Sequence, residues 1–274
     1  MIKGIDVSKW QGSIEWHRVK ADDHNIKFAI VKAGGSDKGF YKDETFERNY
    51  KGAKDVGLDV GCYYIVGNKF ISKNDGIADA ERFYNIIKGK KFDFPVYLDL
   101  EKTLPKDKAG ATEASIAFCD YMESKGYYVA IYASDISGFK EKLDTPKLNA
   151  YDKWVANYIE KPTYVKTYGI WQYSSKGAIK GIIGNVDMDE CYKDYPHIMA
   201  VNGLNGYSKT KPTPKPQPKP TPKPKNDIYI VKKNDNLTKI AKAKKVKLKD
   251  LIKANPQIKD INVIHVGDKI KIPR

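Results

Sequence analysis

Short apolar runs and longer amphipathic stretches alternate along the first 200 residues of the chain. The short runs are rich in β-branched and aromatic side chains and end at turn residues, which is typical of strands. They lie near residue 5 and at 27–33, 59–66, 94–101, 127–134, 153–158, 168–174 and 185–190. The pattern therefore predicts about eight strands.

Three stretches between the earlier strands carry apolar residues at helical spacing. They cover 43–57, 76–89 and 112–126, and each ends on a glycine suited to close a helix. Strands that alternate with helices favour an α/β fold, here a β/α barrel of the TIM type. From residue 153 on, the segments between strands are too short for full helices, so we expect the last third of the barrel to be irregular.

A proline-rich segment divides the chain. Residues 209–225, "KTKPTPKPQPKPTPKPK", contain seven prolines and six lysines and no acidic residue. Alternating prolines favour extended polyproline II, which makes this segment a semi-rigid linker. We therefore expect a large domain at 1–208, a linker at 209–225 and a small domain at 226–274.

The net charge of +15 is concentrated behind that boundary. Residues 1–208 hold 30 basic and 29 acidic side chains, whereas residues 226–274 hold 13 basic and 5 acidic ones. The basic tail suggests a polyanionic partner, although a lysine-rich surface that serves only solubility is an equal alternative. No nucleic-acid-binding motif accompanies the lysines, so nucleic acid is not an expected partner.

Composition and termini narrow the class of protein. No apolar stretch approaches the length of a bilayer-spanning helix, so no membrane insertion is expected. The start "MIKGIDVSKWQG" has no apolar signal-peptide core, which leads us to expect synthesis in the bacterial cytoplasm and action after release. Cys62, Cys119 and Cys191 cannot all pair and are interpreted as reduced packing residues.

The run "FPVYLDLE" ends on two acids at alternate positions. In an extended strand, Asp99 and Glu101 project to the same side, so their carboxyl groups meet. Barrel enzymes place working residues at the carboxyl ends of strands, where Asp6 and Asp187 are also expected. Chance polarity at a strand end is the plain alternative for any one of them. Together the four acids predict one shared cleft.

Aromatic side chains lie toward the same strand ends. They are Tyr64, Tyr132, Trp154, Tyr158 and Trp171. An acidic cleft with an aromatic wall suits a sugar polymer, because pyranose faces are apolar and carboxyl groups serve as acid, base or charge stabiliser. A metal site on four acids is the rival, but it normally serves phosphate chemistry, and no phosphate-binding glycine loop is visible. Neither a metal nor a cofactor is expected.

The segments "KGIDVSKWQG", "YLDLE", "AIYAS", "KWVANY", "GIWQYSSKG" and "NVDMDE", in that order, resemble glycoside hydrolase family 25 across residues 2–192. The resemblance implies an irregular β/α barrel and hydrolysis of the β-1,4 bond between N-acetylmuramic acid and N-acetylglucosamine in peptidoglycan. It implies Glu101 as general acid, Asp99 as its partner at the reacting sugar, and Asp6 and Asp187 as supporting acids.

The same resemblance places substrate-binding residues. Tyr64, Tyr132, Trp154, Tyr158, Trp171 and Gln172 would line the groove. This chain departs from the family pattern in its third strand, where "YYI" puts Tyr64 in place of a histidine. A neighbouring negative charge and burial would raise the pKa of the least solvated acid, as a proton donor requires. The spacing fits both retaining and inverting hydrolysis.

Residues 229–273 resemble a lysin motif (LysM), a small α+β module with the order strand, helix, helix, strand. The resemblance implies binding of N-acetylglucosamine-containing glycans, with contacts expected from Asp235, Asn236, Leu237, Asn255, Pro256 and Ile258. The positive charge would add attraction to anionic wall polymers such as teichoic acids.

These observations predict a cell-wall lysozyme of the endolysin type. A bacterial autolysin and a non-catalytic glycan-binding protein are the alternatives. A single LysM module on a tether would bind weakly, which leaves a monomer and weak self-association both open.

Overall fold

The computed structural model describes residues 1–209, 227–232, 235–258, 260–261 and 263–273. The chain forms two compact units, Met1–Lys211 and Pro212–Arg274. Across the described ranges, every helix is either too short or too polar to pass through a membrane.

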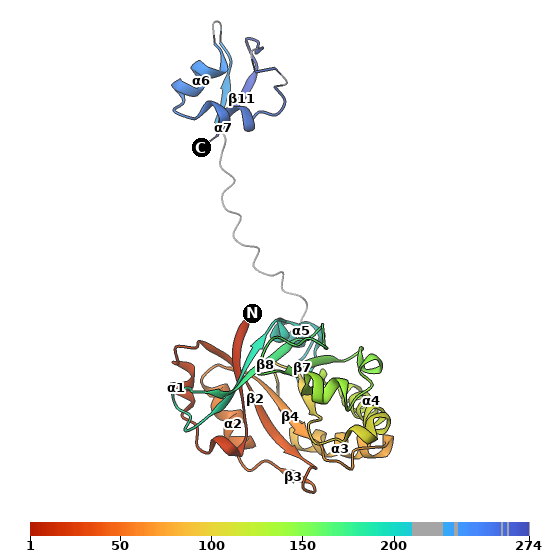
Figure 1. The fold of residues 1–274 in the computed structure, drawn as a ribbon. Coiled ribbons are helices and arrows are strands. Elements are labelled where there is room, and N and C mark those ends of the chain that lie inside the picture. The colour runs from red at the N-terminus through yellow and green to blue at the C-terminus, as the bar shows by residue number, and fades with distance from the viewer. Residues whose placement is uncertain (210–226, 233–234, 259, 262, 274) are drawn as a thin grey trace. The chain divides into compact units, whose positions relative to one another are not determined.

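The first unit is a closed barrel of eight strands, with helices around its outside (Figure 1). All eight strands expected from the sequence are present. The ring order is β1-β9-β8-β7-β6-β5-β4-β2, and β2 pairs back to β1. The strands are β1 (Ile2–Val7), β2 (Ile26–Gly35), β4 (Asp59–Ile65), β5 (Val96–Asp99), β6 (Val129–Ser134), β7 (Asp152–Ala156), β8 (Ile170–Gly177) and β9 (Val186–Cys191).

The three predicted helices are confirmed as α2 (Phe46–Asp55), α3 (Lys73–Ile87) and α4 (Lys108–Ser124). The glycines beyond them, Gly57, Gly89 and Gly126, have φ of 70°, 81° and 84°. A side chain is strained in this left-handed region, which explains why the helices end at glycine. The short α1 (Trp16–Lys20) and β3 (Tyr41–Lys42) were not predicted.

The last third of the barrel is irregular, as expected. Between β6 and β7 the chain forms only a π-helical turn (Asp135–Lys140) and a 3-10 turn (Thr145–Leu148). Strand β9 runs antiparallel to both neighbours, β1 and β8. Helix α5 (Tyr195–Asn202) then covers the end of the barrel at which the parallel strands begin, where the Tyr195 ring lies 5.3 Å from Phe94 and 6.0 Å from Tyr128.

Alternation along the strands separates two apolar cores. Phe28, Ile30, Tyr97 and Trp154 point into the barrel. The residues one position along, such as Val31, Leu98 and Val155, point outward and pack against the helices or the connecting segments. Because a parallel strand is buried on both faces, a shift of one residue decides whether a side chain reaches the barrel interior.

The second unit has the expected LysM order: β10 (Asp227–Ile230), α6 (Leu237–Ala243), α7 (Leu248–Lys253) and β11 (Lys269–Ile272). Strands β10 and β11 pair antiparallel. Its small core contains Val231, Leu237, Ile240 and Leu251. The Asn236 side chain accepts a hydrogen bond from the Lys239 backbone N–H and so caps α6.

Candidate active site

A polar pocket of about 130 Å³ opens at the end of the barrel where the parallel strands finish. Eight of its nine lining residues were named from the sequence, four as acids and four as substrate-binding residues. The lining consists of Asp6, Tyr63, Asp99, Glu101, Tyr132, Trp154, Tyr158, Gln172 and Asp187. The four expected acids therefore share one pocket.

Asp6 and Asp187 lie directly opposite each other in the β1–β9 ladder. Opposite residues of an antiparallel pair project to the same face, so both carboxyl groups enter the pocket. Asp187 was expected at the carboxyl end of its strand, which is wrong: it is the second residue of β9. It reaches the mouth because β9 runs antiparallel, which brings its beginning to the end where β1 finishes.

Asp99 is the last residue of β5, and Glu101 follows just beyond the strand. Asp99 is 3% exposed, and its Oδ1 accepts a hydrogen bond of 3.1 Å from the Glu101 backbone N–H. The Glu101 side chain is 46% exposed and lies near Lys102, with 3.8 Å between Oε1 and Nζ. The pair thus combines a fixed buried acid with a longer, open one.

A chain of hydrogen bonds orients Asp6 from the pocket wall. The hydroxyl groups of Tyr132 and Tyr158 donate to Gln172 Oε1 over 2.8 Å and 2.7 Å. Gln172 Nε2 in turn donates to Asp6 Oδ2 over 2.7 Å. Gln172 and Asp6 are both buried, so the bond between them is shielded from water and is strengthened by the hydroxyl groups that polarise Gln172.

Asp189 is a fifth acid that the sequence interpretation missed. It lies two residues beyond Asp187 on the same face of β9 and is completely buried. Trp154 Nε1 donates to its Oδ1 over 2.8 Å, whereas Oδ2 has no donor among the described residues. The signal was present: "DMD" has the same alternate spacing that identified Asp99 and Glu101.

Burial and crowding raise the pKa of the acids inside the pocket. Burial is the main cause for Asp6, Asp99 and Asp189, whose pKa values lie well above the ordinary value. Asp187 and Asp189 add to the effect on Asp6, and Glu101 adds to that on Asp99. Burial followed by the charge of Glu101 raises the pKa of Asp187 to about 6.

Burial was expected to raise the pKa of the least solvated acid in the cleft. The least solvated acids are Asp6, Asp99 and Asp189, whereas the Glu101 side chain is 46% exposed. Burial and the mutual repulsion of carboxylates in so small a space both favour the protonated forms of these three acids.

Two expected groove residues lie elsewhere. Tyr64 is fully buried on the outer face of β4, where its hydroxyl donates to Asp79 Oδ1 over 3.1 Å and its ring lies 5.4 Å from Phe83. Its neighbour Tyr63 enters the pocket in its place. Trp171 points away from Gln172 and donates from Nε1 to the Asn157 carbonyl over 2.8 Å, outside the pocket lining.

Other chemistry-bearing residues do not form a second centre. Cys62, Cys119 and Cys191 are buried and unpaired. In the described part of the chain, histidine, cysteine and carboxylate side chains form no cluster of three arranged to hold a metal ion.

The LysM residues named from the sequence divide into buried and accessible ones. Leu237 and Asn255 are 2% and 1% exposed, so their expected role as direct glycan contacts is corrected to a structural one. Asn255 Nδ2 donates to the Leu251 and Lys271 carbonyls over 2.8 Å each. The Asp235 carboxylate accepts hydrogen bonds from the Tyr229 hydroxyl and the Lys232 backbone N–H. Asn236 and Pro256 are exposed. Ile258 lines a groove of about 470 Å³ beside β11.

Family models match both units of the chain. Residues 5–182 match the glycosyl hydrolases family 25 model, a range that contains Asp6, Asp99 and Glu101 and ends before Asp187. Residues 229–273 match the LysM domain model.

Two proteins of similar sequence are named as lysozymes. The chain is 32% identical over 190 residues to the autolytic lysozyme of Clostridium acetobutylicum, which covers 69% of this chain and 55% of that protein. It is 28% identical over 204 residues to lysozyme M1 of Streptomyces globisporus, covering 69% and 67%. The chain thus spans about half the length of the Clostridium relative.

Solved structures agree with this grouping. The structure of the CTP1L endolysin has 27% identity and a TM-score of 0.63, covering 74% of this chain and 70% of that one. The bacterial lysozyme of Streptomyces coelicolor has 26% identity and a TM-score of 0.57, covering 70% and 92%. The chain therefore belongs to glycosyl hydrolases family 25 and carries a LysM domain behind its proline-rich linker.

Proposed function

We propose that the chain is a lysozyme that hydrolyses the β-1,4 bond between N-acetylmuramic acid and N-acetylglucosamine in peptidoglycan. The observation that carries the proposal is the meeting of Asp6, Asp99, Glu101 and Asp187 in one pocket, on a barrel that belongs to a glycoside hydrolase family. Two carboxyl groups on either side of a scissile glycosidic bond are the common requirement of such hydrolysis.

Glu101 is the proposed general acid. It has the longest side chain of the acids and the most open position, so it can reach a glycosidic oxygen that enters from the mouth. Its proton passes to that oxygen as the bond to the anomeric carbon breaks, and nearby carboxylate stabilises the positive charge that develops on the sugar. Water then supplies the hydroxyl group of the new reducing end at the anomeric carbon, and its released proton restores the acid. Asp99, whose Oδ1 accepts a hydrogen bond from the Glu101 backbone N–H, is the proposed partner of Glu101 at the reacting sugar.

Asp6 and Asp187 set the charge of the pocket. Their opposite positions in the β1–β9 ladder hold two acids close together, and the chain from Tyr132 and Tyr158 through Gln172 fixes one oxygen of Asp6. A negative charge this close favours retention of a proton on neighbouring acids. We infer that these residues tune the site and do not themselves attack the sugar.

The walls of the pocket supply a surface for the sugar rings. Trp154 forms its floor with Tyr132, whose ring centre lies 4.4 Å away, and Tyr63 stands beside them at 6.1 Å. Tyr158 is 51% exposed at the rim and offers a face for a neighbouring sugar. Aromatic rings pack well on the apolar faces of pyranoses.

The LysM domain is proposed to hold the enzyme on the wall by binding glycan. The groove that includes Ile258, together with the exposed Asn236 and Pro256, supplies accessible positions for such contacts. A tethered second module raises the local concentration of the barrel at its substrate. We propose that the site of action is the bacterial wall. The similar proteins include both an autolytic lysozyme and an endolysin, and the proposed chemistry fits either biological setting.

Product analysis tests the reaction. Purified peptidoglycan digested with the full chain should yield fragments whose new reducing ends are N-acetylmuramic acid, as identified by borohydride reduction and mass spectrometry. New N-acetylglucosamine reducing ends would assign the other glycosidic bond and contradict the proposal. No new reducing ends would favour a glycan-binding protein without catalysis.

A further inference from the structure

A second crevice lies at the opposite end of the barrel from the acidic pocket. It has a volume of about 610 Å³ and is lined by segments that precede β6, β7 and β8 and by Lys193, which follows the antiparallel β9. All of these positions lie where the parallel strands begin. The crevice sits where the irregular barrel has only short turns between β6 and β7, beside the start of helix α5, whose Tyr195 hydroxyl bonds to Asp152.

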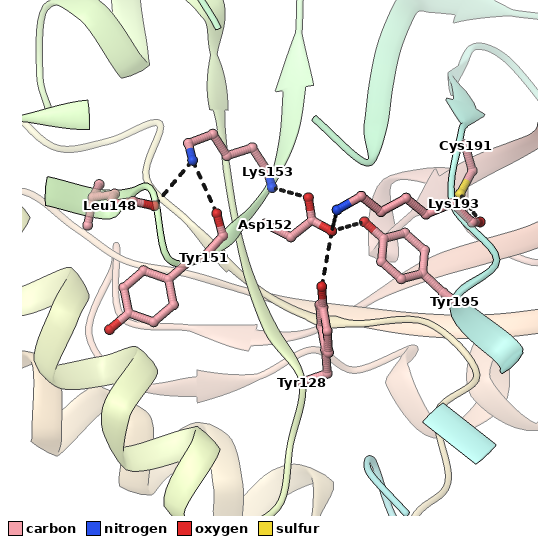
Figure 2. Close-up of polar contacts among 8 residues, drawn as sticks. All are labelled: Tyr128, Leu148, Tyr151, Asp152, Lys153, Cys191, Lys193 and Tyr195. Atoms are coloured by element: carbon pink, nitrogen blue, oxygen red, sulfur yellow. Dashed lines mark hydrogen bonds and ion pairs between the residues drawn. The ribbon is translucent and has the colours of Figure 1, made fainter. Parts of the chain in front are cut away.

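The crevice is lined by more basic than acidic side chains. Among its lining residues are three lysines, Lys153, Lys166 and Lys193, and one acid, Asp152. Figure 2 shows that Asp152 is already satisfied: its Oδ2 accepts from Lys193 Nζ, Tyr195 OH and Tyr128 OH over 2.8, 2.7 and 3.3 Å. Its Oδ1 accepts from the Lys153 backbone N–H.

Lys153 is the unusual member of this group. It is 6% exposed on the outer face of β7, the face on which its neighbour Val155 packs in the apolar core. Its Nζ donates to the Leu148 and Tyr151 carbonyls over 3.2 and 3.1 Å (Figure 2), and it forms no ion pair within the described residues. Burial lowers the pKa of this lysine. A buried ammonium with only two neutral acceptors is costly unless an anion joins it.

We propose that this crevice binds the phosphate groups of a polyol-phosphate polymer of the bacterial wall, as a second binding site separate from the acidic pocket. Lys153 and Lys166 supply the positive charge, and the exposed lining residues Tyr164 and Thr167 offer hydroxyl groups for the hydroxylated repeat between phosphates. Phosphodiesters keep their charge at all physiological pH values and accept several charge-assisted hydrogen bonds. The choice of a wall polymer rests on the proposed function; the anion site itself does not.

The position of the crevice fits a role in attachment. In barrel enzymes the end at which the strands begin carries no catalysis. Tyr207, near the last described residue of the first unit, lies at the same end of the barrel, because its hydroxyl donates a hydrogen bond to Asp93, which precedes β5.

The test uses the full chain and a synthetic poly(glycerol phosphate) hexamer, followed by two-dimensional NMR of the backbone amides. This readout separates the crevice from the basic linker and tail, because each amide reports its own site. We expect saturable shifts at residues 149–153 and 165–167. Lys153→Met and Lys166→Gln should each weaken this binding about ten-fold, as the loss of a charged hydrogen-bond donor predicts. Lys166→Gln should fold normally because Lys166 is exposed.

Lys27→Gln is the matched control, since Lys27 is an exposed lysine at the start of β2, at the same end of the barrel but outside the crevice. It should leave the affinity unchanged. Three results would each overturn the site. They are shifts confined to the linker and tail, equal hexamer affinities for all variants, and a response to peptide-stem carboxylates without a response to the hexamer. Loss of the proposed hydrolysis would be seen separately, because Glu101→Gln protein should still bind the hexamer in the crevice.

Discussion

Asp6 and Asp187 stand directly opposite each other on neighbouring antiparallel strands, and both point into the pocket that contains Glu101. The two residues are 181 positions apart in the sequence and meet only because β9 closes the barrel onto β1. The charge state of each acid in the pocket therefore depends on its neighbours.

The pKa of Asp187 should respond to Glu101. Glu101 is one of the two causes that raise the pKa of Asp187 to about 6, so Glu101→Gln should lower that pKa while burial keeps it above its ordinary value. Carbon-13 NMR of the side-chain carboxyl during a pH titration measures the midpoint in both proteins. The control is Glu113→Gln, at an exposed position on α4. An unchanged midpoint for Glu101→Gln would mean that the two carboxyl groups do not interact.

Asp189→Asn should be well tolerated. The carboxyl group of Asp189 is completely buried, and burial raises its pKa, which favours the neutral form that resembles an amide in charge and shape. We expect hydrolysis within a few-fold of wild type, with the Trp154 hydrogen bond kept. Asp189→Leu, which removes the acceptor of Trp154 Nε1, should cost about 1–3 kcal/mol of stability. A variant Asp189→Asn that folds but is inactive would show that the ionised carboxylate is needed.

The stability difference between Asp189→Asn and wild type should grow with pH. A raised pKa means that the folded chain binds the proton of Asp189 more tightly than the unfolded chain does. The stabilisation from this proton is therefore fully present below about pH 4, the pKa of an unfolded aspartate, and is lost as pH rises toward the pKa of the folded state. The asparagine variant lacks this loss. Tryptophan fluorescence during urea unfolding reports the barrel alone, because all four tryptophans lie within residues 1–208. Equal differences at pH 4 and pH 8 would contradict the assignment.

Tyr63 and Tyr64 should behave differently on truncation although they are neighbours. Tyr64→Ala leaves a cavity among Phe83 and Phe118 and should cost about 3–5 kcal/mol of stability. Tyr63→Ala removes a pocket wall and should chiefly reduce hydrolysis, with a smaller effect on unfolding. Tyr64→Phe, which keeps the ring, serves as the control for packing. Unfolding and initial lysis rates measured on the same preparations separate the two effects; a reversed order would contradict the face assignment.

In the LysM domain, Ile258 and Asn255 should separate binding from folding. Ile258→Ala should weaken attachment to purified walls with the domain intact, because Ile258 lines the groove. Asn255→Ala should unfold the domain, because its side chain bonds to the backbone of both α7 and β11. Hydrogen exchange at the amides of Ile270 and Ile272, on either side of Lys271 in the β10–β11 ladder, follows folding without depending on the deleted side chain. Attachment unaffected by Ile258→Ala would remove this groove from the glycan site.

Much of the barrel could be predicted because its strands and helices are local patterns. The eight apolar runs, the three helices that end at glycine and the shorter connections after residue 153 all correspond to observed elements. The direction of β9 could not be predicted, since an apolar run reads the same in both directions. Asp187 was expected in the pocket because its strand would end there. It lies in the pocket because β9 runs antiparallel and begins there.

The phase of side chains in β4 and β8 was the main source of error in the site. Both faces of β4 are buried, so the run "GCYYIV" has no polar alternation to show which tyrosine points inward. Only the barrel geometry places Tyr63 inside and Tyr64 outside, and likewise Gln172 inside and Trp171 outside. Asp189 was a different kind of omission, because its spacing from Asp187 already indicated a shared face.

The rate of peptidoglycan hydrolysis by Glu101→Gln protein tests the central claim most directly. The amide keeps the size of the side chain at its exposed position but cannot donate a proton as an acid, so release of new reducing ends should fall by about 10²–10⁴-fold while the protein remains folded and attached to the wall. Glu160→Gln, at an exposed residue outside the pocket lining, should hydrolyse at the wild-type rate. Wild-type hydrolysis by the Glu101→Gln protein would contradict the proposed mechanism.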